Sequence, residues 1–159
     1  MRDTIRLCES RCGEHGIKFT AHIKPVDFIK DTAETVDAWL FGGGKRGGFD
    51  CAILNPPYRK INSNSETRAL IRRIGVETGN LYSGFLAAAV MLLDRKGELI
   101  AITPRSFCNG PYFRNFRQFF LSEMSLHQLH VLDSREEAFK DDDVLQETII
   151  FRATKDREK

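Results

Sequence analysis

Apolar residues recur with helical spacing in several parts of the chain. Residues 2–14 place Ile5, Cys8 and Cys12 on or near one face of a short helix, and Gly16 follows as a stop signal. Residues 81–93 are apolar nearly all round, which predicts a well-buried helix. Further helices are predicted over residues 31–41, 67–75 and 112–122.

Other segments have the patterns of strands. Residues 17–24 alternate apolar and polar side chains, whereas 49–54 and 98–103 are short apolar runs typical of buried parallel strands. Residues 126–132 and 146–152 predict two more strands. Because these strands alternate with helices, the sequence predicts an α/β fold of three layers with a mostly parallel sheet.

Polar and glycine-rich segments separate these elements. Residues 42–48 contain five glycines and predict a flexible loop, residues 59–66 predict a polar loop, and the stretch with three aspartates at 141–143 predicts a solvated turn. Ligands of such sheets bind beyond the carboxyl ends of the strands. Asn55, Thr103 and Asp27 are all expected at such ends.

Composition narrows the possible functions. A length of 159 residues fits one domain, and the formal net charge of +2 means that any nucleic-acid contact must come from local basic clusters. No apolar run approaches the ~20 residues of a membrane span, and the charged N-terminus lacks the apolar core of a signal peptide. We therefore expect a soluble cytoplasmic protein. Its four cysteines form no zinc quartet, so we expect reduced thiols and no metal.

The segment Asn55-Pro56-Pro57-Tyr58 carries the most specific chemistry. Two prolines directly after a buried strand fix the backbone and remove two N–H donors. Asn55 adds a side-chain carbonyl acceptor, and the Pro56 carbonyl can point away from the sheet. Tyr58 adds an aromatic face. Two acceptors beside a ring suit a planar group that carries an amine.

This segment resembles the catalytic motif of amino-methyltransferases that use S-adenosylmethionine. The resemblance implies that Asn55 and the Pro56 carbonyl hold the exocyclic amine of an extrahelical adenine, with Pro57 in the same rigid turn. It also implies that Tyr58 stacks on the base, and that the base is flipped out of double-stranded DNA. Catalysis would come from orientation and charge placement, without a metal or a covalent intermediate.

Flanking segments extend the resemblance. Val26-Asp27-Phe28 resembles the segment that contacts the adenine of S-adenosylmethionine, with Asp27 accepting from its amino group and Phe28 on its ring; Asn55 also borders this cofactor. Residues 112–117 resemble the segment that supplies a second stacking ring, and we align Phe113 with that role. Tyr112 and Phe107 compete for it, and packing in the core is an alternative for Phe113, as a helix cap is for Asp27.

The resemblance covers residues 15–154 and is closest to gamma-order adenine-N6 DNA methyltransferases of restriction–modification systems. In that family the fold is Rossmann-like, and the final strand runs antiparallel between two parallel ones. The glycine-rich cofactor turn of the family is not found before Asp27. We therefore expect residues 1–159 to form a single, incomplete catalytic domain that is inactive alone. Its open strand edges would favour self-association or a missing N-terminal half.

Basic residues near the motif suggest contacts with DNA. Arg59, Lys60, Arg105 and Arg114 are the candidates for the phosphate backbone, although an ordinary charged surface explains them equally well. Methyltransferases that act on a protein glutamine or on RNA share the motif. A non-catalytic remnant that binds DNA, a specificity subunit or another partner is a further alternative.

Overall fold

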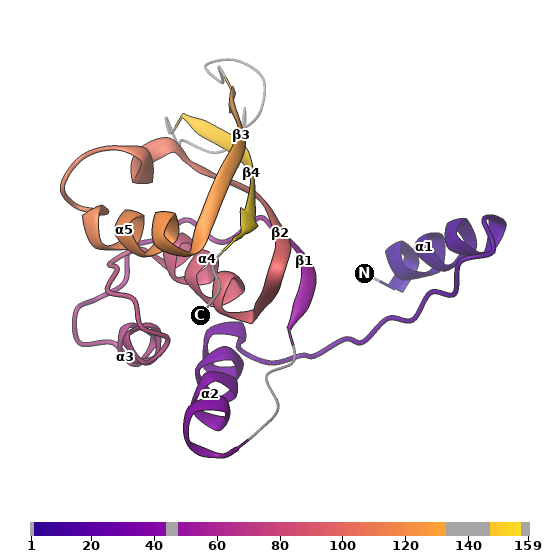
Figure 1. Ribbon diagram of the computed structural model, residues 1–159, viewed down its shortest axis with the longest axis horizontal. Coiled ribbons are helices and arrows are strands. Elements are labelled where there is room, and N and C mark those ends of the chain that lie inside the picture. Colours follow the sequence, from indigo (N-terminus) through magenta and orange to yellow (C-terminus); the bar gives the residue numbers. More distant parts are fainter. Residues whose placement is uncertain (1, 44–47, 133–146, 157–159) are drawn as a thin grey trace.

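A computed structural model describes residues 2–43, 48–132 and 147–156 and contains one four-stranded sheet (Figure 1). Its strands, in spatial order, are β1 (Phe49–Leu54), β2 (Leu93–Pro104), β4 (Thr148–Lys155) and β3 (Met124–Leu132). β1 pairs with β2 in parallel, and β4 is antiparallel to both β2 and β3. The expected antiparallel strand between two parallel ones is therefore confirmed. The sheet is mixed rather than mostly parallel, because only the β1–β2 pairing is parallel.

Five α-helices and one short 3₁₀ helix accompany the sheet in the described part of the chain. They are α1 (Arg2–Glu14), α2 (Phe28–Phe41), α3 (Glu66–Arg73), α4 (Leu81–Leu92), η1 (Arg105–Cys108) and α5 (Arg114–Glu123). Each predicted helix exists. α2 begins three residues earlier than its apolar pattern indicated because the Asp27 carboxylate accepts a hydrogen bond from the Lys30 N–H and so caps the helix.

The strand predicted over residues 17–24 is wrong. This segment has no regular structure and is mostly exposed, and in Figure 1 it leads from the main body out to α1. Strand-like alternation needs a neighbouring strand to satisfy the backbone, and none of the described strands pairs with this segment. Asp27 therefore precedes a helix and does not end a strand. Residues 44–47 of the loop predicted over 42–48, and the turn predicted at 141–143, lie outside the described residues.

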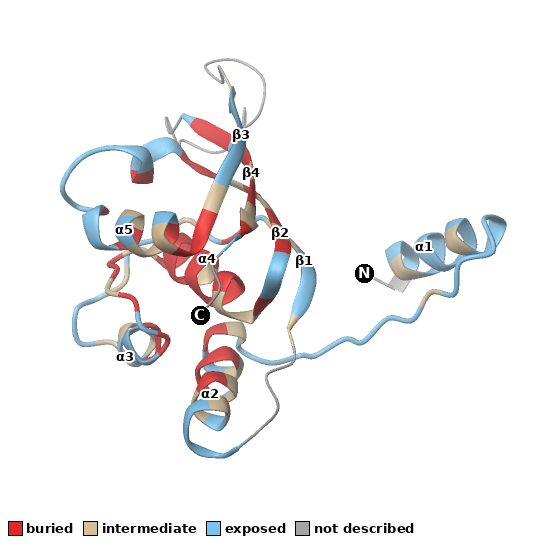
Figure 2. Cartoon of the chain, viewed as in Figure 1, coloured by how far each residue is buried: buried red, intermediate tan, exposed pale blue. Residues whose placement is uncertain are grey.

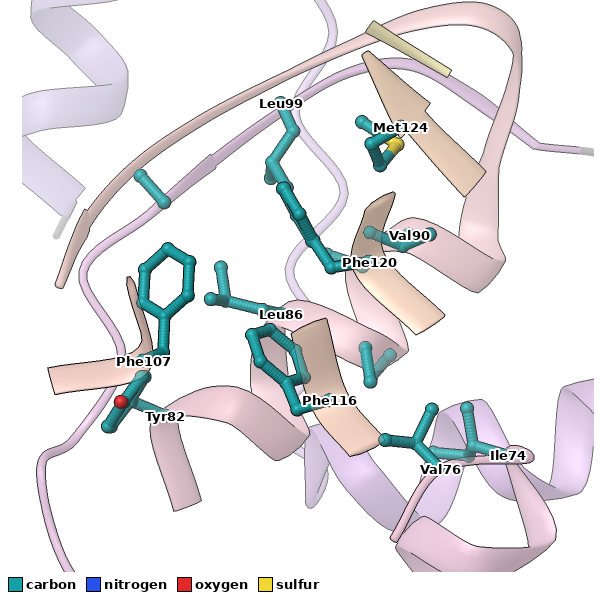
Figure 3. Packing of buried hydrophobic residues seen from close by; sticks show 14 of the residues in the cluster. Ile74, Val76, Tyr82, Leu86, Val90, Leu99, Phe107, Phe116, Phe120 and Met124 are labelled. Atoms are coloured by element: carbon teal, nitrogen blue, oxygen red, sulfur yellow. The ribbon is translucent and has the colours of Figure 1, made fainter. Parts of the chain in front are cut away.

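The core fills the space between the sheet and the helices. α4 packs on β1 and β2, while α5 packs on β3 and on α4. Aromatic rings from α5 and η1 meet aliphatic side chains of α4 and β2 there, as Figure 3 shows for Phe116, Phe120, Phe107, Leu86 and Leu99. Both Ala87 and Ala88 are fully buried, which lets α4 approach its neighbours closely. This packing fixes the strand ends on which the candidate site is built.

The opposite face of the sheet is open among the described residues. Partners in the strand register share a face, and Ile53, Ile100, Ile102 and Ile150 fall on the side away from α4 and α5. Ile53 is 76% exposed, and β1 is an edge strand that is mostly exposed in Figure 2. The expected third layer is therefore not formed by the described helices, because α1 lies apart from the sheet (Figure 1). No helix in those residues is long and apolar enough to cross a membrane.

The buried Lys155 should be a strong determinant of stability. Its ammonium donates hydrogen bonds of 2.7 Å to the carbonyls of Val90 and Leu93, at the C-terminal end of α4. Lys155→Met should lower the free energy of unfolding by about 2–3 kcal/mol, because two buried carbonyls lose charged donors. Urea denaturation measures this loss. The exposed Lys18→Met is the control, and an equal loss in both variants would contradict the assignment.

Candidate active site

Asn55-Pro56-Pro57-Tyr58 directly follows β1, beside the C-terminal end of β2. Asn55 and Pro57 are exposed, Pro56 is buried and Tyr58 is half-buried. The prolines end the strand because neither can donate an N–H to continue the ladder with β2. The turn is thus anchored by one proline, while the asparagine amide faces solvent at the sheet edge.

The Tyr58 hydroxyl ties this turn to the neighbouring strand. It lies 3.1 Å from the Ile102 carbonyl oxygen on β2 and 3.3 Å from Oδ1 of Asn55. Ile102 lies one register position beyond the last β1–β2 pair, Leu54 with Ala101. The Tyr58 hydroxyl can therefore donate to the Ile102 carbonyl, which lies beyond the last paired residues of β1 and β2. The two prolines that follow β1 have no N–H that could extend this pairing. The phenol is protonated at neutral pH and can act as a donor, and burial raises the pKa of Tyr58 above its ordinary value.

A row of aromatic rings runs from Tyr58 toward α5. The Tyr58 ring meets Tyr82 edge-on at 6.1 Å, Tyr82 lies 5.5 Å from Phe113, and Phe113 meets Tyr112 edge-on at 4.8 Å. The Tyr82 hydroxyl is 3.0 Å from Ser106 Oγ on η1, and burial raises the pKa of Tyr82 strongly. The row joins the turn after β1, the first turn of α4 and the segment before α5.

The exposed ring in this row is Tyr112 and not Phe113. Phe113 is only 6% exposed and packs within the core, whereas Tyr112 is 59% exposed. Phe107, the other competitor, is also buried. The stacking role aligned with Phe113 therefore stays a prediction, and the geometry favours its neighbour Tyr112.

A short backbone clamp fixes the residues that follow the motif. Ile61 donates its N–H to the Gly79 carbonyl and Leu81 donates to the Arg59 carbonyl, each at 2.8 Å. Lys60 and Asn80 form the isolated β-bridge between them. The loop predicted at 59–66 is thus held at its start against the N-terminal cap of α4, which places the side chains of Arg59 and Lys60 in solvent beside the motif.

Some of the basic residues are exposed, and others form ion pairs or hydrogen bonds within the protein. Arg59, Lys60 and Arg114 are exposed, whereas Arg105 is ion-paired to Glu147 at 2.5 Å. Arg68 and Arg72 bind Glu77, and the guanidinium of Arg117 donates to the carbonyls of Phe107, Asn109 and Gly110. Arg117 therefore shapes the loop before α5. Arg59, Lys60 and Arg114 keep the best access to a phosphate backbone.

Asp27 and Phe28 lie at the start of α2. One carboxylate oxygen of Asp27 accepts the Lys30 N–H at 3.0 Å, as the helix-cap alternative expected. A carboxylate has two oxygens, so this cap leaves acceptor capacity for an amino group. The half-buried ring of Phe28 packs against Phe85 of α4 at 5.4 Å. The assignment of Asp27 and Phe28 to the adenine end of S-adenosylmethionine stays a prediction.

Several residues of the site were not predicted from the sequence. Tyr82 was assigned only to a buried helix, and neither Gly79 nor Ser106 was singled out. A polar aromatic residue in the first turn of an otherwise apolar helix is a signal for Tyr82, because a buried phenol needs a partner. No group of three or more His, Cys, Asp or Glu that could hold a metal occurs in the described residues.

The fold is similar to that of a known class of protein. A solved structure described as a class I S-adenosylmethionine-dependent methyltransferase of Listeria monocytogenes superposes with a TM-score of 0.55 at 10% sequence identity. The match covers 70% of this chain and 33% of that one. The chain therefore has part of the Rossmann-like methyltransferase fold.

The chain belongs to the Eco57I restriction-modification methylase family, whose model matches residues 8–139. It is 47% identical over 151 residues to the Type II methyltransferase M.PstI of Providencia stuartii, a match that covers 95% of this chain and 29% of the relative. It is 56% identical over 107 residues to the Type II methyltransferase M.BsuBI of Bacillus subtilis, which covers 67% and 21% respectively. The chain thus spans less than a third of the length of these relatives.

The Tyr58 hydroxyl gives a pH-dependent prediction. Tyr58→Phe should lower the free energy of unfolding at pH 7 by about 1 kcal/mol, the usual value of one hydrogen bond. The ordinary pKa of a tyrosine is 10.0, and burial raises it in the folded state. The folded state therefore favours the protonated phenol, and its stabilisation, complete below pH 10, is lost as the pH rises above 10.

Chemical denaturation between pH 7 and 11 tests this dependence. Stability should fall less steeply above pH 10 in Tyr58→Phe than in the unsubstituted protein. The variant Tyr112→Phe removes the hydroxyl of a mostly exposed tyrosine and serves as the control. Identical slopes in the unsubstituted protein and in Tyr58→Phe would show that this phenol is not held protonated by the fold.

Proposed function

We propose that this chain is part of the catalytic domain of a DNA methyltransferase. The reaction is transfer of a methyl group from S-adenosylmethionine to the exocyclic amine of an adenine flipped out of duplex DNA. The observation that carries the proposal is the turn after β1, where the exposed amide of Asn55 lies 3.3 Å from the Tyr58 hydroxyl. The Type II methyltransferases M.PstI and M.BsuBI support the same class of reaction.

The mechanism follows from the acceptors at the turn. Asn55 Oδ1 and the Pro56 carbonyl accept the two N–H groups of the amine and orient its lone pair toward the donor. When bound, S-adenosylmethionine supplies an electrophilic methyl group on a sulfonium. The amine held by Asn55 and the Pro56 carbonyl would take this methyl group, S-adenosylhomocysteine would leave, and the surplus proton of the nitrogen would pass to solvent water. The rigid prolines reduce the reorganisation of these acceptors during the reaction.

The Tyr58 ring would stack on the target base. A second ring would come from the segment before α5, where the predicted Phe113 is buried and its neighbour Tyr112 is exposed. Arg59, Lys60 and Arg114 contribute phosphate contacts on double-stranded DNA, while Arg105 would first exchange its ion pair with Glu147. Asp27, Phe28 and Asn55 border the cofactor. No metal takes part in this scheme, and we expect a cytoplasmic location.

We further propose that residues 1–159 form an incomplete domain that needs a second polypeptide segment for activity. The matches cover only 29% of M.PstI and 33% of the Listeria methyltransferase, so about two thirds or more of each chain lies outside the match. The open face and free edge of β1 would receive the segment that carries the glycine-rich cofactor turn. In its absence the same edge would favour self-association.

Asn55→Ala tests the amine-binding site. Methyl transfer from labelled S-adenosylmethionine to DNA should be negligible for this chain alone. It should appear when the remaining segment of an M.PstI-type methyltransferase is supplied. Asn55→Ala should then lower kcat about 100-fold or more, because an oriented acceptor is lost. The exposed Asn64→Ala, nine residues further along, is the matched control.

The same assay separates the alternative functions. Methylation of a protein glutamine or of RNA, without methylation of DNA, would contradict the DNA proposal. If no methylation occurs with the supplied segment, and Asn55→Ala weakens DNA or partner binding, the chain is a binding remnant.

The variant Ile53→Lys tests whether the second segment binds at the edge strand β1. A charge on the exposed edge strand should weaken capture of the supplied segment at least tenfold, as measured by calorimetry, and should reduce self-association in light scattering. Leu121→Lys, on the exposed surface of α5, is the matched control. The assignment of β1 as the binding edge would be overturned by two results together: the unsubstituted chain is monomeric, and Ile53→Lys binds the supplied segment as well as Leu121→Lys does.

A further inference from the structure

Tyr82 is a buried residue that contacts the proline turn from the core. Only 1% of its surface is exposed. Its ring meets the Tyr58 ring edge-on, with the two centroids 6.1 Å apart and the ring planes at 84°. Rings in this arrangement attract one another, because the positive edge of one ring faces the negative face of the other. The core therefore reaches the motif through the ring of Tyr82.

The first turn of α4, which carries Tyr82, is itself held at two points. The Tyr82 hydroxyl lies 3.0 Å from Ser106 Oγ on η1, the short helix that directly follows β2. The Leu81 N–H donates at 2.8 Å to the carbonyl of Arg59, the residue that follows the motif. The Tyr82 side chain is thus fixed to η1, while the backbone beside it is fixed to the segment after the proline turn.

Two contacts at different points hold the side chain of Tyr58. Its hydroxyl lies 3.1 Å from the Ile102 carbonyl oxygen on β2, and its ring lies against Tyr82. The hydrogen bond fixes the position of the hydroxyl, and the edge-on contact fixes the orientation of the ring. Together they select one rotamer of a side chain that is only half-buried.

Tyr58 in turn contacts the residue that is to bind the amine. Its hydroxyl lies 3.3 Å from Oδ1 of Asn55, whose side chain is exposed. We propose that Tyr82 is a positioning residue for methyl transfer: by holding the Tyr58 ring, it keeps the acceptor of Asn55 in place. Because Tyr82 is buried, it acts through Tyr58 and does not touch the substrate. This inference rests on the proposed function, since it gives the orientation of Asn55 a role in the reaction.

The kinetic test measures methyl transfer to DNA by the chain together with the remaining segment of an M.PstI-type methyltransferase. Tyr82→Leu removes the ring that contacts Tyr58 and should lower kcat about 10- to 100-fold, because small displacements of an oriented group have large effects on rate. KM for DNA should stay within about threefold, because no contact with DNA is lost. Tyr82→Phe keeps the ring and should retain kcat within about threefold of the unsubstituted protein. Tyr82→Met fills the core space with a flexible side chain, and should show the same loss if Tyr82→Leu does not fold.

Phe120→Leu is the matched control for the loss of a core ring. Phe120 is 2% exposed, and it contacts the core rings Phe107, Phe116 and Phe151. Its substitution should lower stability but change kcat by no more than about threefold. The proposal would be overturned by an unchanged kcat in Tyr82→Leu, or by an equal loss of kcat in Phe120→Leu.

A second readout separates this inference from the proposed function. In the protein alone, NMR couplings between the Hα and Hβ protons of Tyr58 report whether its side chain holds one χ1 rotamer. They should indicate one rotamer in the unsubstituted protein, in Tyr82→Phe and in Phe120→Leu, and an average of several in Tyr82→Leu. If Tyr58 keeps one rotamer in Tyr82→Leu, the positioning claim fails while the Asn55 assay still tests the reaction. If that rotamer is lost as expected but the unsubstituted protein with its supplied segment methylates no DNA, the proposed function is wrong, and with it the role of Tyr82 in the reaction.

Discussion

The hydrogen bond between the Tyr58 hydroxyl and the Ile102 carbonyl constrains the whole site. Two consecutive prolines make a rigid turn, but they also remove the N–H groups that would continue pairing with β2. The phenol offers a donor from the fourth residue of the same motif. The tyrosine therefore has a structural task in addition to presenting a ring, and its hydroxyl reaches the amide of Asn55 as well.

This constraint links the active site to the core. Tyr58 packs on Tyr82, which in turn contacts Phe107 and Phe113. The turn after β1 is therefore in contact with aromatic rings that belong to the core beside α5. Figure 3 shows Tyr82 and Phe107 at the margin of that packing. An exposed asparagine can be held in place because the residues beside it belong to a densely packed layer.

The sequence predicted the features that depend on local chemistry. The run 49–54, the helix beginning at Leu81 and the proline turn were found because apolar spacing and proline geometry act over a few residues. The strand at 17–24 failed because alternation indicates only the propensity for a strand, and pairing requires a neighbour. The burial of Phe113 and the exposure of Tyr112 could not be predicted for the same reason: adjacent aromatic residues look alike in sequence, and only tertiary packing determines which one is buried.

The antiparallel placement of β4 has a consequence for the order of folding. β3 pairs with β4 and not with β2, so it cannot join the sheet until β4 has arrived between them. Of the described strands, β4 comes last along the chain, which gives the sheet contacts of long sequence separation and a slow closing step. During synthesis β3 is therefore made before β4, and its apolar face stays unpaired beside α5 until β4 has been synthesised. In this interval the chain is most open to mispairing with other strands.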